Sequence, residues 1–273
     1  MDAKISVTTR CNGRCRTCPV WQIAGEDMPV DVFKRVWQKL VEAPEVGRIL
    51  INNTGDMYIH PDRSELFDWI ERNQPKPVIM TTNAAEMDYV PRIAELIISF
   101  NGYDRESYEY TTGLDFFETV NRIRAKYTEI QTRVGNAEIH CLMWGDTYVD
   151  GAEERLAILW KDFPGCVRVS FKYDNQQAED LTLERYRQAE RIPCDYLDKL
   201  NVWPNGDCIM CAHDFRGSTV WGNLLEQSVS GVLSSHKRLI KKAEHAAGEY
   251  TGICAKCNYN VAELPGEVRY LRG

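Results

Sequence analysis

The chain has 273 residues, of which 44% are hydrophobic and 27% are charged, a composition typical of a folded globular protein rather than a disordered one. Its net charge of −7 argues against broad binding to nucleic-acid phosphates, which requires a basic surface. No apolar run approaches the roughly 20 residues that span a membrane, and the N-terminus does not resemble a signal peptide. We therefore expect a cytoplasmic protein with no membrane partner.

The N-terminal two thirds of the chain alternate between short apolar runs, which predict strands, and stretches of 3.6-residue periodicity, which predict helices. The expected strands cover residues 4–8, 48–52, 77–81, 97–101, 138–143 and 167–172. The expected helices cover residues 31–43, 64–73, 88–96, 115–127 and 151–162, with Asp31 as the N-cap of the first. This series predicts an α/β fold with a parallel sheet, either an open doubly wound sheet or a partial barrel.

The alternation stops near residue 190. Residues 200–203 and 208–212, joined by a glycine-containing turn, predict a β-hairpin, and a helix is expected over about residues 229–246. We therefore divide the chain into a large domain over residues 1–190 and a small α+β domain over residues 191–273.

The ten cysteines are unevenly distributed along the chain. Most of them fall into two terminal groups, and only Cys141 and Cys166 lie between. Without a secretory signal, clustered cysteines indicate metal ligands or catalytic thiols rather than disulfides.

The first group consists of Cys11, Cys15 and Cys18, spaced C-x3-C-x2-C in the loop after the first expected strand. Three thiolates on one short loop can bind three corners of a cubane iron–sulfur cluster and leave the fourth iron open to a ligand. Gly13 permits a tight loop, and the flanking arginines at positions 10, 14 and 16 are expected to lower the thiol pKa values. The alternative is a zinc site, although zinc usually takes paired C-x2-C motifs.

This spacing resembles the signature of radical S-adenosylmethionine (SAM) enzymes. The resemblance implies a partial (β/α)6 barrel and a [4Fe-4S] cluster whose free iron binds SAM. It also implies an electron donor such as flavodoxin or ferredoxin, and cleavage of SAM to a 5′-deoxyadenosyl radical that abstracts a hydrogen from the substrate. One position departs from the family, because Thr17 stands before the third cysteine where an aromatic residue is usual.

Other segments fit the same family. Residues 53–61 resemble a drifted Gly-Gly-Glu-Pro motif, which implies that Gly55 and Asp56 bind SAM. Asp56 would accept a hydrogen bond from the SAM ammonium, although it could also be a turn acid. Thr81 and Asn83 resemble a Thr-Asn-Gly motif, and Ser99 occupies a strand position that often contacts SAM but could equally be a plain strand serine. Tyr103, Asp104, Glu106 and Tyr108 could line a substrate pocket or form the exposed start of a helix.

The second cysteine group allows two interpretations. The pairs at 208/211 and 254/257 are typical of a zinc ribbon. Alternatively, Cys194, Cys211, Cys254 and Cys257 resemble the ligands of an auxiliary [4Fe-4S] cluster in the twitch domain, a short form of the SPASM domain of radical SAM enzymes. We favour the second interpretation, which leaves Cys208 spare. Cys208, or Cys141 if it faces a barrel lumen, could donate a hydrogen atom to a substrate radical, but either could be a buried core thiol.

The resemblance implies that the chain oxidises or epimerises a small natural-product or carbohydrate-like substrate with help from the auxiliary cluster. An alternative is the same chemistry on a polymer, either a ribosomal peptide or a hypermodified thymine base in viral DNA. A third possibility is a non-enzymatic zinc or iron–sulfur protein.

Overall fold

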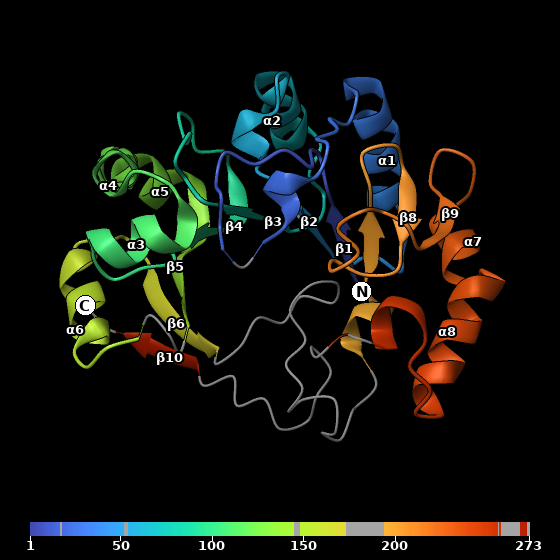
Figure 1. Cartoon of the computed structure of the whole chain (residues 1–273). Helices are drawn as coiled ribbons and strands as arrows, with labels where there is room; N and C mark the ends of the chain where they lie inside the picture. Colours follow the sequence, from blue (N-terminus) through green and yellow to red (C-terminus); the bar gives the residue numbers. More distant parts are fainter. Residues whose placement is uncertain are drawn as a thin grey trace.

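The computed structural model describes residues 1–16, 18–51, 54–144, 148–172, 194–255, 257 and 268–271. Its centre is one ten-stranded sheet with the order β10-β6-β5-β4-β3-β2-β1-β7-β8-β9 (Figure 1).

Six parallel strands form the middle of this sheet. They are β1 (Asp2–Ile5), β2 (Arg48–Ile51), β3 (Val78–Thr82), β4 (Ile93–Ser99), β5 (Val134–Trp144) and β6 (Cys166–Lys172). They follow one another in chain order, and each pairs in parallel with the next. A doubly wound sheet would reverse its strand order part-way, whereas a sequential order is that of a barrel wall. The structure therefore confirms the prediction of an α/β partial barrel.

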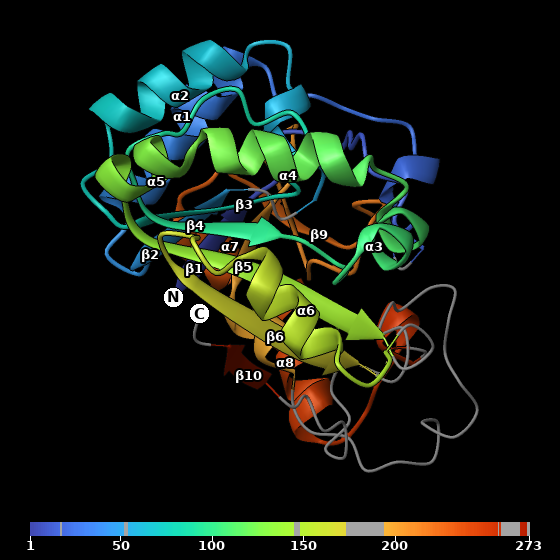
Figure 2. The ribbon, with the colours of Figure 1, turned by 90° about the vertical axis from the view of Figure 1, so that its left-hand side faces the viewer.

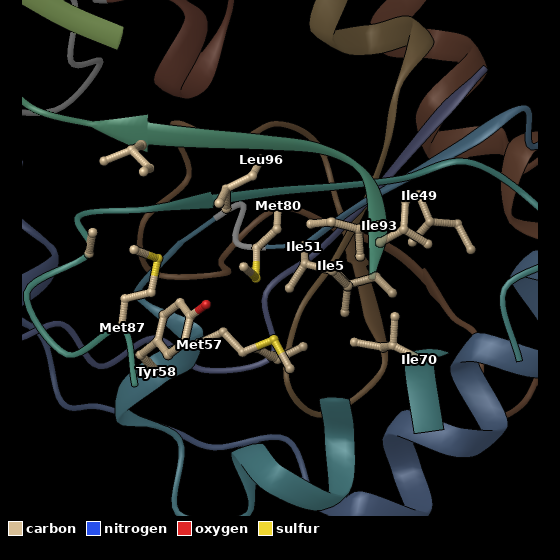
Figure 3. Packing of buried hydrophobic residues seen from close by; sticks show 14 of the residues in the cluster. Ile5, Ile49, Ile51, Met57, Tyr58, Ile70, Met80, Met87, Ile93 and Leu96 are labelled. Carbon is tan, nitrogen blue, oxygen red and sulfur yellow. The ribbon is translucent and has the colours of Figure 1, made fainter. Parts of the chain in front are cut away.

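The helices associated with these strands pack on one face of the sheet (Figure 2). They are α1 (Val30–Glu42), α2 (Arg63–Arg72), α3 (Arg105–Thr112), α4 (Phe116–Ala125), α5 (Tyr127–Arg133) and α6 (Ala152–Leu159). Two short 3₁₀ helices, η1 (Val20–Gln22) and η2 (Met57–Ile59), lie in the connections that follow β1 and β2. The core lies between sheet and helices, where Ile5, Ile51 and Met80 meet Ile70 of α2 and Met57 of η2 (Figure 3). Burial of these apolar side chains is the main stabilising contribution to this layer.

The opposite face of β1–β6, here called the inner face, carries more polar side chains. Because successive residues of a strand point to opposite faces, Ala3 and Ile5 enter the core while Lys4 lies on the inner face. The same alternation places Ser99 and His140 on the inner face, where the register aligns them on neighbouring strands. The inner face is therefore the side of the barrel wall that can contact a polar ligand.

The C-terminal part of the chain extends both edges of this sheet. Strand β7 (Leu200–Val202) pairs in parallel with β1 and is followed by β8 (Asp207–Ile209) and β9 (Val220–Asn223), both antiparallel to their neighbours. At the other edge, β10 (Val268–Leu271) is antiparallel to β6. The remaining elements are η4 (Asp195–Asp198), α7 (Val229–Leu233), α8 (His236–Ala246) and η5 (Gly252–Ala255). The expected boundary at residue 190 lies outside the described residues and stays a prediction.

Three sequence predictions of secondary structure are wrong. Residues 88–92 are not helical, and β4 begins at Ile93, because Pro91 favours an extended Val90 and the apolar run after it is a strand buried on the core side. Asp31 lies in the first turn of α1 rather than at its N-cap, which is Pro29. The helix expected over residues 229–246 is interrupted at Ser234 and Ser235, so that α7 and α8 are separate.

Candidate functional site

The cysteine loop after β1 brings three thiols close together, two of them beside Gly13. A Cβ atom built on Gly13 would lie 3.5 Å from the Cys15 Sγ and 3.7 Å from the Cys11 Sγ, so the two sulfurs flank the same position. The Cys18 amide donates to the Cys15 carbonyl at 3.1 Å, which turns the loop back on itself. Backbone hydrogen bonds from Arg14 and Arg16 also tie the loop to the end of α3. These hydrogen bonds fix the conformation of the loop and its position relative to α3.

Burial raises the pKa values of all three thiols. It raises the pKa of Cys11 to about 11, with a further contribution from the charge of Asp56, and that of Cys15 to about 12, with contributions from the other two sulfurs. The pKa of Cys18 is also raised by burial. The prediction that neighbouring arginines lower these values is therefore wrong.

The arginines have other partners. The Arg10 guanidinium pairs with Asp27, and the Arg16 guanidinium lies over the Tyr110 ring, 4.1 Å from its centroid. Because burial raises the thiol pKa values and the arginines do not lower them, the three thiols are neutral without bound metal. Metal binding would have to displace their protons.

Gly55 and Asp56 connect β2 to the cysteine loop. Gly55 has a φ of +75°, and a Cβ there would lie 2.3 Å from the Thr8 carbonyl oxygen and 2.6 Å from that of Arg10. Only glycine fits, because both the conformation and the contact exclude a side chain. The next amide, of Asp56, donates to the Arg10 carbonyl at 2.9 Å. This contact fixes the residue that precedes Cys11.

Asp56 is 3% exposed, and its carboxylate joins η2 to the end of β3. It accepts hydrogen bonds from the Tyr58 amide at 3.0 Å, from Thr82 Oγ1 at 2.9 Å and from the Asn83 amide at 2.8 Å. Burial raises the pKa of Asp56, and these donors oppose the shift. Asp56 caps η2 and holds the end of β3, and its contact with SAM stays a prediction.

The other residues expected to contact SAM lie near this point or along the inner face. Asn83 follows β3 and reaches Cys11 directly: its Nδ2 lies 3.7 Å from the Cys11 Sγ. Thr81 of β3 aligns with Ile97 of β4, so Thr81 and Ser99 share the inner face of adjacent strands. Thr17 and Asn53 lie outside the described residues.

The second group of cysteines meets in one pocket. Cys194, Cys211, Cys254 and Cys257 line a cavity of about 20 Å³ together with Leu197, Met210 and Ile253. Burial raises the pKa of Cys194 to about 11, aided by the charge of Cys257, and raises that of Cys211, aided by those of the other three thiols. In the described part of the chain, no three His, Cys, Asp or Glu side chains are gathered tightly enough for a single metal ion. The pocket thus offers four soft ligands around a shared apolar space.

Lys4 connects the inner face to this pocket, which sequence reasoning missed. Its ammonium lies 4.7 Å from the centroid of the Tyr196 ring, and Tyr196 lines the pocket of the four thiols. Burial, with a smaller effect of Lys199, lowers the pKa of Lys4 to about 8. Its position facing the pocket depends on the pairing of β1 with β7, and no local sequence pattern reveals this pairing.

The two candidate hydrogen donors are both fully buried in the hydrophobic core. Cys208 is 0% exposed, and burial raises its pKa. Cys141 lies on the helix side of β5, with its Sγ 3.7 Å from the Gly102 carbonyl oxygen. It therefore does not face the lumen, the condition under which it could act as a hydrogen donor, and is instead a buried core thiol. The inner face instead carries Cys166, whose Sγ lies 3.9 Å from Glu138 Oε2.

An open cleft of about 790 Å³ lies between the start of α3 and the start of α6. Tyr103, Asp104 and Glu106 line it, and the Arg155 guanidinium bridges to Asp104 at 3.0 Å. Tyr108 does not line this cleft: its ring stacks on Phe100 in the core, with 4.2 Å between the ring centroids. Three of the four residues expected to line a pocket are thus together.

Comparisons with known proteins rest on structure rather than on sequence. No family model matches the sequence, and no curated protein matches it. The crystal structure of BtrN in complex with AdoMet and 2-DOIA is 16% identical, with a TM-score of 0.58, and the alignment covers 94% of this chain and 92% of BtrN. The structure of anSMEcpe with bound AdoMet is 13% identical, with a TM-score of 0.61 and coverage of 96% and 88%.

A third similar structure is that of Streptococcus suis SuiB bound to S-adenosylmethionine. It is 12% identical, with a TM-score of 0.58 and coverage of 95% and 72%, and SuiB has also been solved with its precursor peptide SuiA. The fold is that of radical SAM enzymes. None of the described helices is long and apolar enough to cross a membrane.

Proposed function

We propose that the chain is a radical SAM enzyme whose Cys11, Cys15 and Cys18 hold a [4Fe-4S] cluster. The observation that carries the proposal is the closeness of these three thiols on one loop, which the Asp56 amide fixes through the Arg10 carbonyl, where β1, β2 and β3 end. The carboxyl ends of parallel strands are where barrel enzymes place their sites. The similarity to three structures with bound AdoMet supports this location.

The residues around the loop fit such a cofactor. When bound, the cluster would supply one electron to SAM and thereby open a route to hydrogen abstraction. The chain contributes three thiolates as ligands, while Gly55, Asp56, Thr81, Asn83 and Ser99 are the proposed SAM contacts. The three thiols are only partly exposed, which limits the access of water to the site, and limited access of water protects a reactive radical from side reactions.

We also propose that Cys194, Cys211, Cys254 and Cys257 hold an auxiliary [4Fe-4S] cluster. Four thiols around an apolar cavity support it, because a cubane separates its ligands onto four irons, whereas a zinc ion draws all four onto one point. The inner face lies between the two groups, since β1 leads into the cysteine loop and pairs with β7 next to the pocket. An auxiliary cluster there could take up the second electron of a two-electron oxidation.

The proposed substrate is a small polar molecule of natural-product or carbohydrate type, which the enzyme oxidises or epimerises. The inner face supports this class: His140 Nε2 is hydrogen-bonded to Ser170 Oγ at 2.9 Å, and Arg168 Nε donates to Glu138 Oε1 at 2.8 Å. Such groups suit hydroxyl and carbonyl oxygens. The extensive alignment with BtrN, which binds 2-DOIA, favours a small substrate, while the SuiB complex with a precursor peptide keeps a peptide as the second candidate.

The test is iron and sulfide content together with SAM cleavage, on protein reconstituted without oxygen. We expect about eight irons per wild-type chain and about four in the Cys11→Ala, Cys15→Ala, Cys18→Ala triple variant. 5′-Deoxyadenosine should form only with the wild type, given dithionite or a flavodoxin as electron donor. Zinc in place of four irons would make the second site structural, and cleavage by the triple variant would disprove the proposal.

A further inference from the structure

The side-chain amide of Asn83 has three hydrogen-bond partners, which fix its orientation. Its Oδ1 accepts from the Ala85 amide at 2.9 Å, and its Nδ2 donates to Asn12 Oδ1 at 2.7 Å. The second N–H of the same Nδ2 is directed to the Cys11 Sγ at 3.7 Å. An amide turned the other way would set oxygen against oxygen at Asn12 and nitrogen against an N–H at Ala85, so only this orientation satisfies all partners.

The backbone holds this amide in place relative to the cysteine loop. The Asn83 amide N–H donates to Asp56 Oδ2 at 2.8 Å, and the Asp56 amide donates to the Arg10 carbonyl at 2.9 Å. The residues before Cys11 and at Asn83 are thus tied to the same aspartate. Ala84 has a φ of +62° and is the only non-glycine among the described residues in this region of conformation, which costs about 1 kcal/mol or more. The strained residue, Ala84, directly follows Asn83, whose side chain is directed to the Cys11 sulfur.

We propose that Asn83 is a positioning residue for the N-terminal cluster, and that its N–H···S hydrogen bond to Cys11 raises the reduction potential of this cluster. The proposal rests on the cluster assigned above. Reduction adds one electron, supplied by an external one-electron donor, and makes or breaks no bond to the protein. The added negative charge spreads onto the thiolate sulfurs, where a hydrogen-bond donor stabilises it.

The charge of Asp56 acts in the opposite direction. This carboxylate accepts a hydrogen bond from the Asn83 amide at 2.8 Å, so its negative charge lies beside the residue that contacts Cys11 and disfavours extra negative charge on the cluster. The Asn83 amide stands between the two: its backbone N–H faces Asp56 and its side-chain N–H faces Cys11. Asn83 therefore provides the donor that a site next to a buried carboxylate needs if it is to accept an electron.

The experiment is a potentiometric titration of the reconstituted full-length protein with dithionite, followed by electron paramagnetic resonance. The N-terminal signal is the one that the Cys11/Cys15/Cys18 triple alanine variant lacks. Asn83→Leu keeps the volume but removes the donor, and we expect about a tenfold shift of the redox equilibrium toward the oxidised cluster, which is about 59 mV for one electron. Asn83→Gln, which keeps an amide donor, should recover part of the shift.

Asn12→Ala is the matched control, because it removes the other acceptor of Nδ2 and leaves the donor to sulfur. We expect it to change the equilibrium by no more than about twofold. If Asn83→Leu does not take up iron, Asn83→Ala, which also lacks a side-chain donor, gives the same comparison with a smaller side chain. An unchanged potential in a variant with full iron content overturns this inference alone. A wild-type chain without the N-terminal signal overturns the proposed function as well.

Discussion

The two thiol groups of this chain are built in different ways. Cys11, Cys15 and Cys18 lie on one loop, which backbone hydrogen bonds fix to α3 and to the segment after β2. Cys194, Cys211, Cys254 and Cys257 come from three separate segments, and only the packing of η4, η5 and the end of β8 brings them to one pocket. Burial raises thiol pKa values in both groups.

This difference indicates different tasks. A single short loop supplies three ligands and leaves one iron open, whereas four ligands from distant segments can close a cluster completely. A local loop also depends on a few backbone contacts, while a distributed site depends on the fold of the whole C-terminal part. The variants below should therefore affect one group and spare the other.

The largest effect is expected for Gly55→Val. A side chain at this position would meet the Thr8 and Arg10 carbonyl oxygens, and its φ of +75° is unfavourable for a β-branched residue. We expect loss of the N-terminal iron and a decrease of at least about 100-fold in 5′-deoxyadenosine formation, because the loop can no longer hold its position. The C-terminal iron should remain. Iron content and product analysis measure both.

Gly248→Ala is the matched control for that substitution. Gly248 has a similar φ of +77°, but a Cβ there would meet nothing within 4 Å. It should cost only about 1 kcal/mol of stability and leave the iron content unchanged. Equal iron loss in both variants would mean that backbone strain alone, and not the contact of Gly55 with the cysteine loop, disrupts the site.

The second comparison concerns the distributed site. The Cys254→Ser, Cys257→Ser double variant removes two of its four proposed ligands, and we expect it to lose about half of the iron and to keep the N-terminal signal.

Cys208→Ala tests whether the spare cysteine is a ligand. Because Cys208 is fully buried in the core, the variant should lower stability by about 1–2 kcal/mol and leave the iron content unchanged. Iron loss in Cys208→Ala would mean that Cys208, and not Cys211, is a ligand of the second cluster.

The sequence predicts the local site better than the distributed one. The spacing of Cys11, Cys15 and Cys18 is itself the geometric signal, and the fold then brings Asp56 and Asn83 to this loop as expected for residues that follow adjacent parallel strands. The six parallel strands were also predictable, because their apolar runs are short and rich in β-branched residues.

Other features depend on contacts that no local pattern shows. The continuation of the sheet through β7, and with it the position of Lys4 near the second pocket, arises from long-range pairing. The side of β5 that Cys141 faces depends on the exact register of the strand, since a shift by one residue reverses every side chain. The raised thiol pKa values follow from burial, which outweighs the nearby arginines that the sequence displays.

The smallest expected effect is a change of stability with pH that arises from Cys141. This buried thiol lies outside both cysteine groups, so it is a reference for a thiol that binds no metal. Burial raises its pKa from 9.0 to about 12, so above pH 9 the unfolded chain loses this proton before the folded chain does. The unfolded state then binds fewer protons, and stability falls as pH rises. Relative to Cys141→Ala, the wild type should lose about 1 kcal/mol of unfolding free energy between pH 8 and pH 10. Denaturant unfolding at both pH values measures this loss, which should persist after iron loading because Cys141 binds no metal. If iron removes the pH dependence, Cys141 belongs with the ligand thiols, and the division into two groups is wrong.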